Sequence, residues 1–317
     1  MPGRRHRPLS RAQGRGLRRL PRLALSALLL CAGAACATEP APLPGPRVDY
    51  VATYVWQMDD EQFGGFSGIE ISPDGSRFTA LSDRASIRWG TVERDAEGRI
   101  RGMEPAGRAR LHASNGKPLK PGRQGDSEGL AIGPDGKIWI SFEGLVRVAG
   151  YDTPDSPAQP LPRPPAFKAM QLNSSMEALA ILPDGTLLTL PERSGALTRP
   201  FPVWRWRNGV WDQPFSIPRS GDWLAVGADV GPDGRLYLLE RDFKGLLGFR
   251  SRVRRFDLDE QGVGNEQVLL ESRPMQYDNL EGISVWDDGG GIRLTLISDD
   301  NFNWFQRTEL VEYRVVE

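Results

Sequence analysis

The stretch SEGLAIGPDGKIWISFEG, Ser127 to Gly144, decides the fold. Two short apolar runs flank the triplet Pro134-Asp135-Gly136, and the second run ends in an acid. Proline fixes the backbone at the first corner of a tight turn, aspartate bonds to the backbone ahead, and glycine takes the positive φ that closes the turn. The stretch therefore predicts a β-hairpin.

This hairpin pattern recurs along the chain. The five copies are Phe66–Arg84, Ser127–Gly144, Met176–Arg193, Gly227–Phe243 and Leu280–Phe302. Short strands at a regular period predict an all-β propeller with antiparallel four-stranded blades. At roughly 47 residues per unit we expect a six-bladed β-propeller. Its sixth blade would combine strands from both termini, which would close the ring: Val48–Met58 and Leu310–Val316.

Composition is compatible with such a fold. The chain holds 36 glycines and 26 prolines in 317 residues, which disfavours long uninterrupted helices. Hydrophobic residues make up 39% and charged residues 26%, so the chain can bury a core and is not disordered. We find no linker within residues 47–317 and predict a single β-propeller domain there, expected to be a monomer.

The N-terminus reads as an export signal over residues 1–37. An arginine-rich stretch ends at Arg22, an apolar run follows from Leu23 to Ala35, and small residues end at Ala37. The apolar run is too short for a stable membrane span. We expect cleavage after Ala37 and a periplasmic or secreted protein, with lipid anchoring at Cys36 as the less favoured alternative. Residues 38–46 form a proline-rich leader.

Charge and residue counts exclude several classes of function. The formal net charge is −1, and removal of the signal takes away eight arginines and no acid. The mature chain is therefore acidic, and we expect no nucleic-acid partner. Both cysteines lie in the signal, and the mature chain keeps one histidine, His112. A thiol nucleophile and a histidine-rich zinc site are excluded, so any catalysis rests on carboxylates, arginines and a metal.

Alignment of the repeats places acids at one recurring position. The residues at the entry to the first strand of each hairpin are Ser67, Glu128, Glu177, Val226 and Glu281. Inner strands of a propeller line its axis, so three glutamates from different blades would converge there. Converging carboxylates repel unless a cation lies among them, and a hard cation with oxygen ligands, Ca²⁺ above all, suits them. The structural alternative is that they cap turns or pair with arginines.

A second recurrence lies at the ends of the second strands. These ends carry Asp83, Glu143, Glu192, Glu240 and Asp299. In three repeats an arginine follows the acid directly: Arg84, Arg193 and Arg241. Guanidinium groups bind phosphate or carboxylate in a bidentate manner, so these arginines are candidates for holding an anionic substrate. Salt bridges between blades are the alternative.

With these motifs in hand, the chain resembles the esterase-like activity of phytase family over nearly the whole expected mature chain. The motifs that carry the resemblance are Gly65-Phe66-Ser67-Gly68, Asp126-Ser127-Glu128-Gly129, Ser175-Met176-Glu177-Ala178, Leu239-Glu240-Arg241-Asp242-Phe243, Asp278-Asn279-Leu280-Glu281-Gly282 and Asp299-Asp300-Asn301-Phe302. The resemblance implies an exported propeller that hydrolyses small-molecule esters, phosphate esters included.

Under this resemblance a calcium-dependent mechanism assigns roles to the candidate residues. The metal ligands would be Glu128, Glu177, Glu281 and Asp299, and the substrate-binding residues would be Arg84, Arg193 and Arg241. Glu143 or Glu192 would serve as general base. Two other readings stay open. One is a lactonase-type propeller, and the other is a non-catalytic propeller that binds a ligand or protein and holds a structural ion.

Overall fold

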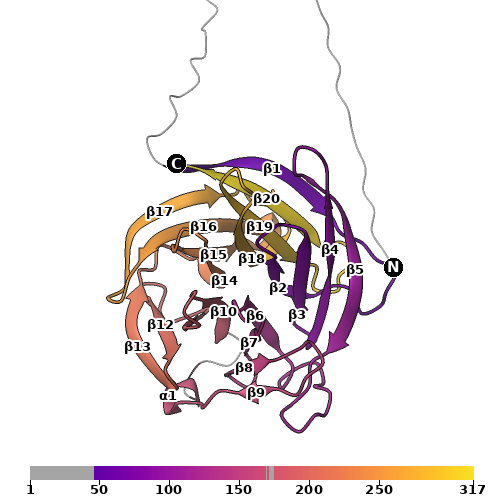
Figure 1. Cartoon of the computed structure of the whole chain (residues 1–317). Coiled ribbons are helices and arrows are strands. Elements are labelled where there is room, and N and C mark those ends of the chain that lie inside the picture. Colours follow the sequence, from indigo (N-terminus) through magenta and orange to yellow (C-terminus); the bar gives the residue numbers. More distant parts are fainter. Residues whose placement is uncertain (1–45, 169, 171–174) are drawn as a thin grey trace, which may run out of the picture. The chain divides into compact units, whose positions relative to one another are not determined.

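The computed structural model describes residues 46–168, 170 and 175–317; the predicted signal and nearly all of the leader lie outside them. Within these ranges twenty strands form five four-stranded antiparallel sheets, arranged as the blades of a propeller (Figure 1). None of the helices in this part of the chain has the length and apolar character needed to cross a membrane.

Each sheet is built mainly from consecutive strands. The first blade contains β2 (Phe66–Ile71), β3 (Arg77–Ser82), β4 (Ser86–Arg94) and β5 (Ile100–Arg110). The second contains β6 (Ser127–Ile132), β7 (Ile138–Phe142), β8 (Arg147–Tyr151) and β9 (Gln159–Pro160). The third contains β10 (Met176–Ile181), β11 (Leu187–Pro191), β12 (Phe201–Arg207) and β13 (Val210–Ile217). The fourth contains β14 (Leu224–Val230), β15 (Leu236–Phe243), β16 (Phe249–Leu258) and β17 (Val263–Glu271).

The fifth blade corrects the predicted blade count. It contains β18 (Asn279–Asp287), β19 (Ile292–Asp299), β20 (Glu309–Val316) and β1 (Arg47–Val55). The two terminal strands, β1 and β20, pair with each other and with β19 in this one sheet. The described residues therefore form five blades, and the prediction of a sixth blade that closes a larger ring is wrong. The error came from the assumed repeat length of 47 residues, because the starts of successive inner strands, at residues 66, 127, 176, 224 and 279, are 48 to 61 residues apart.

The predicted turns are confirmed in detail. Gly75, Gly136, Gly185 and Gly234 all have positive φ, between 70° and 84°. The aspartate before each glycine accepts a hydrogen bond from the backbone two residues ahead, as Asp135 does from Lys137 at 3.1 Å. Aspartate and glycine thus each have the turn role that the sequence predicts. In the described part of the chain two short helices interrupt the strands, namely α1 (Pro165–Lys168) and η1 (Gly245–Leu247).

The inner strands β2, β6, β10, β14 and β18 gather around the middle of the propeller (Figure 1). Residues of all five line one small cavity there. Glycine allows their backbones to approach closely, because a Cβ on Gly129 would lie 2.6 Å from Cβ of Leu179, and one on Gly282 would lie 3.0 Å from Cα of Gly68. Apolar clusters fill the spaces between neighbouring blades. This packing fixes the position of every inner strand relative to the next.

Candidate functional site

A β-bulge in each inner strand directs one side chain per blade. The pairing register of the inner hairpin shifts at the same repeat position in all five blades. The residues within these bulges are Ser67, Glu128, Glu177, Val226 and Glu281. A bulge leaves its extra residue outside the ladder and re-aims the side chain. The repeat therefore presents three glutamates in equivalent directions from three blades.

Carboxylates from four blades lie close enough for the charge of one to shift the pKa of another, and we call them the carboxylate cluster. Its members are Asp83, Asp126, Glu128, Glu143, Glu177, Glu192, Glu281 and Asp299. Burial raises the pKa of Glu128 well above its usual range, and the charges of Glu281 and Asp126 raise it further. Burial, followed by the charge of Glu128, likewise raises the pKa of Glu177. The structure thus brings the three repeat glutamates within range of mutual repulsion.

Three members of the cluster form a group that suits a cation. One carboxylate oxygen each from Asp126, Glu128 and Glu143 lies within 4.8 Å of the others. Burial raises the pKa of all three, and none has an ion-pair partner among the described residues. A set of oxygen donors with uncompensated negative charge fits a hard divalent cation. This group contains Glu128 of the predicted metal ligands, together with Glu143, which we had considered as a general base.

Arg241 neutralises part of the cluster. Its Nη2 lies 2.9 Å from Oε1 of Glu192, and its Nη1 donates to Glu281 and, at 2.9 Å, to Oδ1 of Asn279. Glu281, a predicted metal ligand, is therefore held by an arginine and by the amide of Asn279. Arg241 itself, a predicted substrate-binding residue, uses its guanidinium to join blades three, four and five.

The remaining predicted residues lie at the edge of the cluster. Asp299 accepts a hydrogen bond from the backbone of Asn301 at 2.6 Å, and burial, followed by the charge of Glu281, raises its pKa to about 9. Burial raises the pKa of half-buried Asp83 to about 6, although the charge of Arg84 opposes the shift. The guanidinium carbon of Arg84 lies 3.2 Å from the ring centroid of Phe302. Asp83 is thus a carboxyl group with solvent access and a pKa near neutrality.

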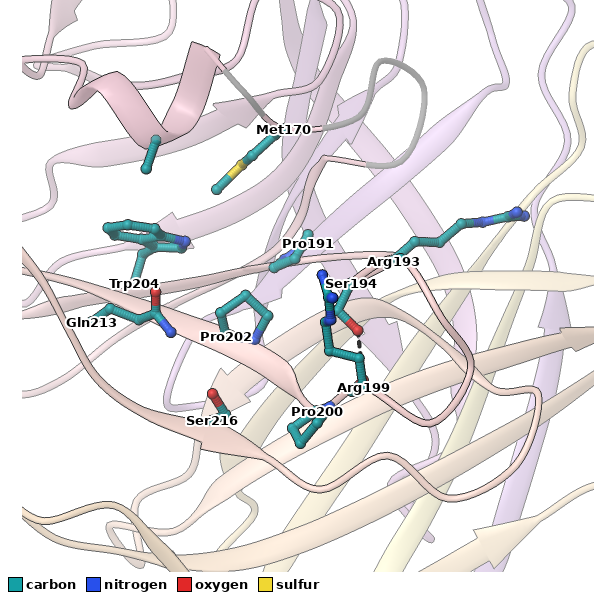
Figure 2. Close-up of a pocket in the computed structure, with 12 residues that line it drawn as sticks. Met170, Pro191, Arg193, Ser194, Arg199, Pro200, Pro202, Trp204, Gln213 and Ser216 are labelled. Carbon is teal, nitrogen blue, oxygen red and sulfur yellow. Dashed lines mark hydrogen bonds between the residues drawn. The ribbon is translucent and has the colours of Figure 1, made fainter.

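A cleft of about 520 Å³ begins beside the cluster, where β11 ends. Arg193 links the two, because its Nε lies 3.3 Å from Oε2 of Glu192. Figure 2 shows Trp204 and Pro202 on one side of this cleft and Arg199 reaching back toward Pro191. In the same view Arg193 extends away from the other lining side chains. Sequence reasoning did not find the cleft, because its walls come from separate strands and loops.

A second acidic pair also escaped the sequence analysis. Glu70 on β2 and Asp229 on β14 occupy the same repeat position, three residues beyond the bulge. Burial, followed by the charge of Asp229, raises the pKa of Glu70 well above its usual range. Burial raises the pKa of Asp229 to about 7, against the hydrogen bonds that it accepts from the backbone of Val285 and Val230. The aligned repeats contain this signal within the inner strands, between the two recurring positions described above.

Comparisons with known proteins place the chain in a family. The model of a family described as "Phytase-like: Esterase-like activity of phytase" matches residues 61–302. No curated protein matches the chain.

Among solved structures, one similar chain is the PQQ-bound form of aldose sugar dehydrogenase from Streptomyces coelicolor. The identity is 15% and the TM-score 0.46, with 87% of this chain and 100% of that chain covered. Another is XC5397 from Xanthomonas campestris, described as a gluconolactonase. There the identity is 17% and the TM-score 0.42, with 78% and 72% covered. These likenesses are too distant to assign an activity.

Proposed function

The chain belongs to the Phytase-like family, esterase-like activity of phytase, and from this membership we propose that it is a metal-dependent hydrolase of phosphate or carboxylic esters. The observation that carries the proposal is the group formed by Asp126, Glu128 and Glu143 inside the larger carboxylate cluster. Eight acids around one site, with only Glu192 and Glu281 paired to arginines among the described residues, favour a site that takes up positive charge. We further propose that the protein acts after export.

Asp126, Glu128 and Glu143 would hold the cation, and we propose Ca²⁺ because all three donors are carboxylate oxygens. When bound, such a cation polarises an ester oxygen and lowers the pKa of a bound water. Glu177 lies close enough to Glu128 for their charges to interact, so it adds negative charge beside this group. Burial, followed by repulsion from neighbouring acids, raises the pKa of Glu128 and Glu143, and the cation would offset both effects.

Among the remaining members, Asp83 is the best placed to move a proton. Its side chain is partly exposed and its pKa lies at about 6, so it is mostly ionised at neutral pH and still basic enough to accept a proton from water. Glu192 is bound by Arg241 and Arg193, and we assign it to holding these arginines. This assignment replaces our earlier choice of Glu143 or Glu192 as general base.

Turnover of 4-nitrophenyl phosphate, 4-nitrophenyl acetate and a simple lactone tests the proposal, each with Ca²⁺ and with a chelator. We expect ester hydrolysis that requires Ca²⁺ and rises with pH through about 6, as Asp83 ionises. Glu128→Gln should lower kcat at least about 100-fold, because a positioned cation contributes several kcal/mol to the reaction. Exposed Glu104→Gln is the matched control and should retain activity.

Two outcomes would contradict the hydrolase proposal. Lactone turnover without ester turnover would identify a lactonase. No turnover at all, together with a Ca²⁺-dependent rise in melting temperature that Glu128→Gln removes, would identify a binding propeller with a structural ion.

A further inference from the structure

The cleft beside the carboxylate cluster carries more positive charge than its surroundings neutralise. Arg193 and Arg199 line it. Arg193 shares Glu192 with Arg241, and Arg199 has no ion-pair partner among the described residues; its backbone carbonyl accepts from Ser194 at 2.6 Å. Figure 2 shows the Arg199 side chain turned back toward Pro191, over the cleft. One guanidinium is therefore available to a ligand.

Arg219 adds a further cation next to this region. It follows β13, whose residue Ser216 lines the cleft, and its guanidinium carbon lies 5.0 Å from the ring centroid of Phe201. All three of its side-chain nitrogens are buried and lack a hydrogen-bond partner among the described residues. An unpaired buried charge is costly. Burial lowers the pKa of Arg219, and the nearby charge of Arg193 lowers it further. An anion in the cleft would offset this concentration of positive charge.

The other wall of the cleft is flat and apolar. Trp204 lies there, with Pro202 next to it (Figure 2). The indole ring is held edge-on by Phe167, with 5.2 Å between the ring centroids, which fixes the orientation of its face. Indole and proline surfaces pack well against an aromatic ring. A volume of about 520 Å³ falls within the range typical of small-molecule sites.

We propose that this cleft binds an aromatic anion, an aryl phosphate or aryl carboxylate, with its charged group on Arg199 and its ring on Trp204. A guanidinium binds either acid through paired hydrogen bonds. The binding itself stands on the cleft alone. Arg193 and Glu192 connect the cleft to the carboxylate cluster, so the bound aromatic anion would be part of the substrate. This second point rests on the proposed function.

Isothermal titration with phenylphosphonate, which has no ester bond to hydrolyse, tests the binding. The titration is done with chelator present and repeated in Glu128→Gln, so that neither the cation nor turnover contributes. We expect saturable binding, weakened about tenfold by Arg199→Gln, since a charge-assisted pair is lost. Trp204→Ala should weaken phenylphosphonate several-fold and leave the affinity for inorganic phosphate unchanged. The matched control is Arg207→Gln, an exposed arginine of the same blade that pairs with Glu260 at 2.7 Å.

The outcomes separate this inference from the proposed function. Absence of saturable binding, or equal affinity in Arg199→Gln and wild type, overturns the inference. Binding with the expected losses, but without hydrolysis of any ester, supports the inference while the hydrolase proposal fails. If esters are hydrolysed, Arg199→Gln should raise KM for 4-nitrophenyl phosphate with little change in kcat, and an unchanged KM counts against the inference. Melting curves verify that each variant is folded, which is expected because Arg199 is exposed.

Discussion

Arg241 shows how a single residue decides which acids of the cluster can bind a cation. It bonds to Glu192 and Glu281 and leaves Asp126, Glu128 and Glu143 without an arginine partner. The sequence alone predicts all three repeat glutamates as metal ligands and Arg241 as a substrate-binding residue. The ion pairs divide the cluster into a neutralised part and a part with free negative charge.

We predict that Arg241→Met destabilises the fold, because it leaves two buried glutamates without their positive partner. The free energy of unfolding should fall by roughly 3 kcal/mol, as for other broken buried pairs. Urea denaturation at neutral pH measures this change. The exposed pair of Arg207 with Glu260 provides the control, and Arg207→Met should cost less than about 1 kcal/mol. Equal losses in the two variants would show that Arg241 does not stabilise the cluster.

At the scale of the strand, the bulges and the glycines next to them do the positioning. Glu128 and Gly129 work together: the bulge re-aims the glutamate, and the glycine lets β6 approach β10. Both the partner strand β7 and the neighbouring blade require this residue to be small, because a Cβ on Gly129 would lie 2.6 Å from Oγ of Ser141 and 2.6 Å from Cβ of Leu179. In each Glu-Gly pair the bulge thus directs the glutamate, and the glycine allows the neighbouring strand to approach.

We predict that Gly129→Ala destabilises the protein by about 2 kcal/mol, as overpacking does in tightly packed interiors. The new Cβ would lie 2.6 Å from Oγ of Ser141 and 2.7 Å from the backbone oxygen of Glu177, so β6 and β10 must separate. Gly264→Ala on β17 is the matched control, because its Cβ would meet no atom within 4 Å. Chemical denaturation of both variants measures the difference. Similar free energies of unfolding for the two variants would mean that β6 and β10 can separate with little loss of stability.

At the scale of the whole molecule, the axis carries titratable groups at two levels. The carboxylate cluster lies at the bulges, and Glu70 and Asp229 lie three residues further along the inner strands. Oγ of Ser284 on β18 donates to Glu70 at 3.4 Å, so this second group joins three blades. Burial raises the pKa of Asp229 to about 7, above that of an unfolded aspartate. Its contribution to stability is complete at low pH and is lost as pH rises through about 7.

We predict that Glu70→Gln raises the melting temperature at pH 8 and has a smaller effect at pH 5. Asp229, with a pKa of about 7, is largely protonated near pH 5, whereas at pH 8 it is largely ionised and its charge lies buried beside Glu70. Glutamine keeps the shape and can still accept from Ser284. Thermal melts in the presence of chelator measure the effect, with exposed Glu104→Gln as control. A shift of the same size at both pH values would show that the pair does not titrate in this range.

Local sequence determined the hairpins, the Pro-Asp-Gly turns, the four-stranded blades and the family, because turn chemistry and strand patterning act over a few residues. It also placed glutamates at equivalent points of different blades. The number of blades was decided by where the terminal strands pair: β20 joins β19, so the predicted pair of terminal strands completes the fifth blade and forms no sixth. Tertiary packing likewise decided that Arg241 forms an ion pair with Glu281 and that a cleft forms beside Glu192. Ion pairs and cavities depend on distances between residues that are remote in sequence.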